Sequence, residues 1–174
     1  KKDYLLCIGN LKKSNAFNYA IEGFAGIVKK FPNLRLKIVG QGVLEHQLKE
    51  IAKNYGVADR VDFEGFQKDI IPFYLHARAT VLTSIYEGFP NVLIESITLG
   101  TPVVSFDCPS GPSEIIKEGS NGHLVKYMDV DDLKNQLLAV LSNKFNIKEM
   151  SSTIKKYHPN EIMKYYVELL NSFN

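Results

Sequence analysis

Two carboxylates, Glu87 and Glu95, lie on either side of the start of a helix predicted over residues 92–99. The first amides of such a helix have no helical acceptor, and they carry a partial positive charge that suits a phosphate or a diphosphate. Carboxylates do not bind phosphate. We therefore expect Glu87 and Glu95 to accept hydrogen bonds from hydroxyl groups, one set on a sugar and one on a ribose.

The helix between these carboxylates is predicted to begin after a capping residue, Asn91, and to end at Gly100. A simpler interpretation of Glu95 is an acid on the solvated surface of this helix. The residues around Glu95 are mostly apolar, which favours a ligand-binding role over a plain solvated face; they are Val92, Leu93, Ile94 and Ile97.

A second candidate for ligand binding is the turn Gly40-Gln41-Gly42. Glycines Gly40 and Gly42 let the backbone approach a ligand closely, and the helix that follows offers its first amides. The same pattern is also typical of an ordinary tight turn, so both interpretations stay open.

Strands and helices are predicted to alternate along the chain. Short, continuously apolar runs predict strands over residues 4–8, 34–39, 61–63, 79–82, 102–106 and 124–125. Apolar residues at helical spacing predict helices over residues 17–28, 44–52, 70–76, 92–99, 130–141 and 159–173, with a short helix after Ser113 as its cap. This order is typical of an α/β fold, a Rossmann-like doubly wound parallel sheet covered on both faces.

In such a sheet, ligands bind beyond the carboxyl ends of the strands. Four loops follow predicted strands and carry candidate residues; they span residues 9–15, 40–42, 83–91 and 107–112. The carboxylates and the glycine turn are therefore expected at one edge of the sheet.

The composition narrows the function classes. A length of 174 residues suits one domain, and 45% hydrophobic residues argue against a disordered chain. A net charge of +2 with scattered basic residues does not indicate nucleic-acid binding.

Cys7 and Cys108 are expected to be reduced, buried thiols of a cytoplasmic protein, and no cysteine or histidine cluster suggests a metal site. Neither a signal peptide nor a membrane-spanning stretch is found, and the abrupt start at Lys1 suggests that preceding residues have been removed.

Residues 84–96 resemble the Glu-x7-Glu motif of retaining family-4 glycosyltransferases with the GT-B fold. Further segments resemble the same family and occur in the family's order; they are residues 36–42, 61–66, 100–104, 111–116 and 121–122. The resemblance implies that residues 1–158 are the C-terminal, nucleotide-sugar-binding domain. It also implies that residues 159–174 form a helix that crosses back to an N-terminal acceptor-binding domain, which this chain lacks.

The resemblance also implies roles for individual residues. Glu87 would contact hydroxyls of the transferred sugar as the catalytic-site carboxylate, Glu95 would hold the ribose, and Phe66 would frame the base. The backbone that meets the sugar and diphosphate would come from Phe89, Pro90, Asn91 and Val92. The reaction would retain the anomeric configuration and would need no metal or other cofactor, since the donor's own phosphate helps to deprotonate the acceptor.

One motif of the family is altered. After the first strand the family shows Gly-Arg-Leu, then three further residues and then a lysine. The arginine and the lysine neutralise the leaving diphosphate. Here Asn10 and Asn15 occupy those two positions, which weakens charge stabilisation where the diphosphate leaves. Lys12 or Lys13 would be substitutes only in a differently folded loop, and solvated loop charges are the simpler interpretation.

Three hypotheses follow. The first is an active transferase that moves a hexose or N-acetylhexosamine from a UDP-linked donor to a glycan or lipid-linked acceptor in bacterial surface polysaccharide synthesis. Residues 108–112 resemble the corresponding loop of such enzymes. This chain alone would be inactive, and peripheral attachment to the inner face of the plasma membrane would depend on the other domain. The second hypothesis is a non-catalytic nucleotide-sugar-binding or scaffolding module, and the third, a GT-B epimerase, lacks identifiable acid and base residues.

Overall fold

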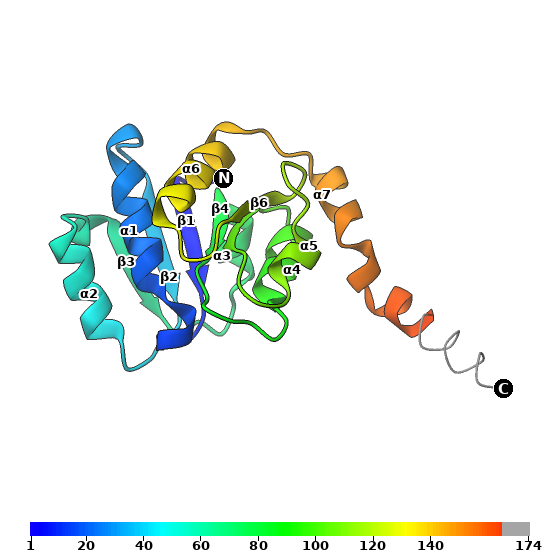
Figure 1. The fold of residues 1–174 in the computed structure, drawn as a ribbon, viewed down its shortest axis with the longest axis horizontal. Helices are drawn as coiled ribbons and strands as arrows, with labels where there is room; N and C mark the ends of the chain where they lie inside the picture. Colours follow the sequence, from blue (N-terminus) through cyan, green and yellow to red (C-terminus); the bar gives the residue numbers. More distant parts are fainter. Residues whose placement is uncertain (165–174) are drawn as a thin grey trace.

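Six parallel strands form one sheet in the computed structural model, which describes residues 1–164 (Figure 1). The order across the sheet is β3-β2-β1-β4-β5-β6, so the predicted doubly wound sheet is confirmed. The strands are β1 (Tyr4–Ile8), β2 (Arg35–Val39), β3 (Val61–Gly65), β4 (Ala79–Leu82), β5 (Val103–Phe106) and β6 (Gly122–Val125).

Seven α-helices lie wholly within the described residues, and a further one begins at residue 159. The seven are α1 (Phe17–Ile27), α2 (Glu45–Asn54), α3 (Ile71–His76), α4 (Asn91–Thr98), α5 (Pro112–Ile115), α6 (Val130–Ser142) and α7 (Ile147–Thr153). The sequence-based prediction missed α7, since only Ile147 and Met150 within it are large and apolar. Asn146 provided a usable signal, because its side chain accepts hydrogen bonds from the amides of Lys148 and Glu149.

The central strand β1 explains why both faces of the sheet are covered. Leu5 and Cys7 point into one apolar cluster, which contains residues of α1, α2 and α6. Tyr4 and Leu6 belong to a cluster on the opposite face, where they pack with Tyr74 of α3. Since neighbouring side chains of a strand point to opposite faces, a continuously apolar strand requires helices on both sides. Both cysteines are free and buried, as expected.

Two predicted helix caps are wrong. α4 begins at Asn91 itself, with Pro90 before it and no side-chain cap, so Asn91 is the first helical residue and not the cap. α5 begins at Pro112 after Gly111, and Ser113 lies inside the helix. In both cases a proline with a fixed φ sits at the helix start, and the turn before the helix takes its geometry from backbone conformation and not from a capping side chain.

The tail helix predicted over residues 159–173 is described only at its start. Residues 159–164 are helical, and the His158 carbonyl accepts hydrogen bonds from the amides of Glu161 and Ile162. The apolar positions expected further along, Tyr165, Tyr166, Leu169 and Leu170, lie outside the described residues.

Candidate functional site

The crevice of the sheet lies where β1 and β4 pair side by side. The chain leaves β1 toward β2 on one side and leaves β4 toward β5 on the other. Since the two connections diverge, the loops after β1 and β4 frame an opening at the carboxyl edge of the strands. The predicted residues Asn10, Asn15 and Glu87 all lie in these two loops.

Hydrogen bonds join the loops after β1 and β4. The Ile85 amide donates to the Ser14 carbonyl at 2.8 Å. The buried Thr83 hydroxyl lies 3.1 Å from the carbonyl oxygens of both Asn15 and Ala16. The two loops therefore form one connected frame around the crevice.

The glycine turn after β2 packs against the loop after β1. Gly40 has a φ of 138°, and a Cβ built there would overlap the Gly9 carbonyl oxygen. A Cβ on Gly42 would lie 2.5 Å from the Leu11 carbonyl oxygen. The Leu11 amide also donates to the Gln41 carbonyl at 3.0 Å. Close contact between two protein loops thus requires both glycines, and any approach of this turn to a ligand stays a prediction.

Asn10 and Asn15 bond to each other and close their loop. The Asn15 side-chain amide donates to the Asn10 carbonyl at 2.8 Å. Lys12 and Lys13 are exposed, and neither forms an ion pair with any residue in 1–164. Both lysines line a cavity of about 320 Å³ between α1, α2 and Ile85 of the loop after β4.

Helix α4 begins at the crevice and presents a free amide there. The Asn91 amide donates to the Phe89 carbonyl at 2.9 Å, and the Leu93 amide donates to the Pro90 carbonyl at 3.0 Å. No acceptor for the Val92 amide is found within residues 1–164. Phe89 is 46% exposed beside this helix end.

The loop that carries Glu87 is supported by the next loop along the sheet. The Ser110 hydroxyl donates to the Glu87 carbonyl at 2.7 Å. Gly111, with a φ of 102°, packs so tightly on the Pro90 ring that no Cβ fits between them. Burial, followed by the charge of Glu87, raises the pKa of the Cys108 thiol to about 11, so this thiol stays protonated at neutral pH.

Glu95 is an exposed residue of α4, and its carboxylate has one hydrogen-bond partner in residues 1–164. The Tyr74 hydroxyl donates to Glu95 Oε2 at 2.7 Å from the neighbouring helix α3. Burial raises the pKa of Tyr74 far above its ordinary value, and the hydrogen bond to Glu95 raises it further. Tyr74 is therefore a neutral, permanent donor to this carboxylate.

Phe66 follows β3 at the same edge of the sheet. Its ring is 70% exposed, and the preceding residue, Gly65, accepts a hydrogen bond of 2.8 Å from the Gly40 amide. The loop after β3 thus lies at the same edge as the loops after β1, β2 and β4, although it was not one of the four loops singled out in the sequence.

Several supporting residues were not identified from the sequence. Thr83, Ser110 and Tyr74 each hold a candidate site residue or its loop, and the Tyr127 hydroxyl donates to the Ile85 carbonyl at 2.9 Å from the loop after β6. No spacing rule marks such pairs, because each joins elements that are distant in sequence.

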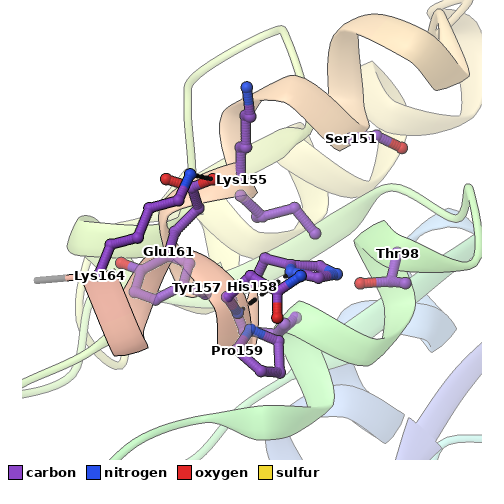
Figure 2. A pocket seen from close by; sticks show the side chains of 11 residues that line it. Thr98, Ser151, Lys155, Tyr157, His158, Pro159, Glu161 and Lys164 are labelled. Atoms are coloured by element: carbon purple, nitrogen blue, oxygen red, sulfur yellow. Dashed lines mark hydrogen bonds and ion pairs between the residues drawn. The ribbon is translucent and has the colours of Figure 1, made fainter.

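A cavity that contains none of these residues lies on the outer face of α4. Its volume is about 760 Å³, and its walls are Ile94 and Thr98 of α4 and the segment 151–164 (Figure 2). Tyr157 from this segment packs edge-on against Phe89, with 5.5 Å between ring centroids. None of the predicted donor residues lines this cavity, so it does not mark the predicted site.

The family model described as "Glycosyl transferases group 1" matches residues 1–160 of the chain. The chain belongs to this family. Within the group 1 glycosyltransferases, it is 30% identical to the amylovoran biosynthesis glycosyltransferase AmsD of Erwinia amylovora, over 98% of the chain and 49% of AmsD. It is 31% identical to the lipopolysaccharide 1,6-galactosyltransferase of Salmonella typhimurium, over 78% of the chain and 39% of that enzyme.

Among solved structures, the lipopolysaccharide outer core galactosyltransferase WaaB in its apo form has the same fold. The TM-score is 0.88 at 28% sequence identity, and the match covers 100% of the chain and 50% of WaaB. The fold is thus that of the C-terminal, Rossmann-like half of GT-B glycosyltransferases. The chain spans no more than about half the length of these relatives. No helix in residues 1–164 combines the length and the apolar character needed to cross a bilayer.

Proposed function

We propose that this chain is the donor-binding domain of a retaining family-4 glycosyltransferase, with a UDP-linked hexose or N-acetylhexosamine as donor. One observation carries the proposal: Glu87 and Glu95 flank the first turn of α4, which opens at the crevice between β1 and β4. Ligands of doubly wound sheets bind at this crevice. The two relatives named above act in amylovoran and lipopolysaccharide synthesis, which supports a role in bacterial surface polysaccharide assembly.

The proposed roles are those that the resemblance implies, and the geometry of the crevice supports them. The free Val92 amide and the positive end of α4 meet the diphosphate, so no metal is required. Glu87, on the loop before α4, accepts hydrogen bonds from the sugar, and Glu95, further along the helix, accepts them from the ribose. Exposed Phe66 provides a flat apolar surface for the base.

A second candidate function is a non-catalytic nucleotide-sugar-binding module. The hydrogen bond from the Asn15 side chain to the Asn10 carbonyl favours it, because that loop closes on itself without a cation. A diphosphate leaving group then gains less stabilisation than an arginine and a lysine would provide. Retention of both Glu87 and Glu95 favours the enzyme.

The acceptor belongs to the remainder of the protein. We propose that an N-terminal domain, absent from this chain, binds a glycan or lipid-linked acceptor and holds the cytoplasmic enzyme at the inner face of the plasma membrane. The present chain is then inactive by itself.

Calorimetric titration of the full-length protein with UDP, GDP and ADP, each in EDTA, tests the donor site. We expect UDP to bind without metal. Glu95→Ala should weaken UDP binding about 10- to 100-fold, the usual effect of losing hydrogen bonds to a charged group. Glu50→Ala, at an exposed carboxylate of α2, is the matched control and should bind as the wild type does. If none of the three nucleotides binds, the proposal is wrong.

A further inference from the structure

We propose that Tyr74 is a positioning residue of the donor site, whose buried hydroxyl fixes the Glu95 carboxylate for the ribose. The inference rests on the proposed function, in which Glu95 accepts hydrogen bonds from the ribose. The inference gives α3 a part in nucleotide affinity, although α3 carries none of the predicted site residues.

The contact joins a buried donor to an exposed acceptor. Tyr74 is 1% exposed, and its hydroxyl donates to Glu95 Oε2 at 2.7 Å. The other oxygen, Oε1, has no partner among the described residues. A free glutamate on a helix surface samples many rotamers and loses that freedom when it binds a ligand. With Oε2 held by Tyr74, Oε1 is oriented before the nucleotide arrives, so less freedom is lost on binding.

A circuit of buried hydrogen bonds keeps Tyr74 itself in place. The Thr101 hydroxyl donates to the Tyr74 carbonyl at 2.6 Å. The Thr101 carbonyl in turn accepts from the Ser96 hydroxyl at 2.9 Å, and Ser96 follows Glu95 directly in α4. Thr101 and Ser96 are both fully buried. The path from Glu95 through Tyr74 and Thr101 thus returns to the residue beside Glu95, which locks α3 and α4 together.

A neighbouring tyrosine shows what a purely structural hydroxyl does in this cluster. Tyr4 packs in the same apolar cluster as Tyr74 and is 5% exposed. Its hydroxyl donates to the Phe73 backbone carbonyl at 2.7 Å, which satisfies the donor inside the protein. Tyr74 instead donates to an exposed carboxylate at the proposed ribose site. Both Tyr4→Phe and Tyr74→Phe therefore delete a hydroxyl from the same cluster, but only Tyr74→Phe removes a hydrogen bond to Glu95.

The test is the dissociation constant of UDP for the full-length protein and its variants, with unfolding in urea measured in parallel. Tyr74→Phe should raise the dissociation constant of UDP about 5- to 20-fold, whereas Tyr4→Phe should change this constant less than about 2-fold. In a Glu95→Ala background, Tyr74→Phe should cause no additional loss, because Tyr74 acts through Glu95. With 2′,3′-dideoxy-UDP, which lacks the ribose hydroxyls, the penalty of Tyr74→Phe should disappear.

The outcomes separate the inference from the proposed function. If UDP fails to bind the wild type, the proposed function is wrong and the inference is wrong with it. If Glu95→Ala loses UDP while Tyr74→Phe binds it as the wild type does, only the inference is overturned. An equal penalty of Tyr74→Phe with and without Glu95 would also overturn it, since Tyr74 would then act through general stability.

Discussion

Gly40 occupies a backbone conformation that an L side chain rarely adopts, and it does so against another loop. We expect Gly40→Ala to lower the free energy of unfolding by about 1–4 kcal/mol, because the φ of 138° is strained and the Gly9 carbonyl must move. Urea denaturation measures this loss. Gly88→Ala is the control, since nothing lies within 4 Å of its Cβ position. Equal midpoints for both variants would contradict the packing role of Gly40.

Asp62 gives a residue-scale prediction of pH dependence. Its carboxylate accepts hydrogen bonds from Arg35 at 2.5 and 2.8 Å, and these bonds hold the pKa of Asp62 below its ordinary value. A carboxyl whose pKa is lower in the folded state stabilises the fold above its unfolded pKa of about 3.9. That contribution is lost as the pH falls through the lower folded pKa.

Asp62→Asn should therefore lower the free energy of unfolding at pH 7 by up to about 1 kcal/mol, the range of partly exposed ion pairs. The difference from the wild type should shrink as the pH falls from 4 to 2. Urea midpoints across this range measure it, with Glu50→Gln as an exposed control. A difference that stays constant below pH 4 would show that charge is not its cause.

At the scale of elements, one buried hydroxyl helps to join the loops after β1 and β4. Thr83→Val keeps the shape of the side chain but removes the buried hydrogen bond to the Asn15 and Ala16 carbonyls. We expect the free energy of unfolding to fall by about 1–3 kcal/mol. Hydrogen exchange should also become faster at the Ile85 amide, which donates to the carbonyl of Ser14, the residue before Asn15. Thr98→Val, at an exposed position of α4, should leave both quantities unchanged. Unchanged exchange in Thr83→Val would argue against a connected frame.

The elements also show what the sequence can predict. Every strand was found, and β1 and β4 most clearly, because a largely apolar run is what a sheet buried on both faces requires. Charged residues interrupt β2 and β3, where Arg35 and Lys37 pair with Asp62 and Glu64 across the strands. Helix α7 was missed because seven residues with two large apolar side chains show no periodicity. The caps of α4 and α5 were wrong because proline geometry, and not a side-chain oxygen, starts both helices.

The candidate site, too, was predictable in part from the sequence. The positions of Glu87, Glu95 and the glycine turn at one edge follow from chain topology, which strand order alone determines. The hydrogen-bond partners of the site residues do not follow from the topology. Tyr74 on the apolar face of a short helix has the pattern of a core residue, and nothing local shows that its hydroxyl reaches α4. The amide of Asn15 has many acceptors within reach, and only the folded loop selects the Asn10 carbonyl.

At the scale of the whole molecule, this domain would supply one wall of the proposed active site. Every predicted site residue lies on the loops after β1 to β4 or on α4. We expect the full-length protein, incubated with a UDP-sugar and a lipid-linked acceptor, to form a product whose anomeric configuration matches the donor, as NMR coupling constants would show. The present chain under the same conditions should form none. Transfer by this chain alone, or inversion in the full-length protein, would contradict the proposed function.

The strand order also sets the course of folding during synthesis. Leu5 of β1 lies opposite Ala79 of β4, so the central pair of the sheet forms only after residue 79 has left the ribosome. Until then β1 pairs with β2 alone and has an open edge, and α6, which covers α1, has not been made. Open apolar edges are where nascent chains associate with one another. We therefore expect this protein to depend most on chaperones while only β1, β2 and β3 have been made, up to about Gly65.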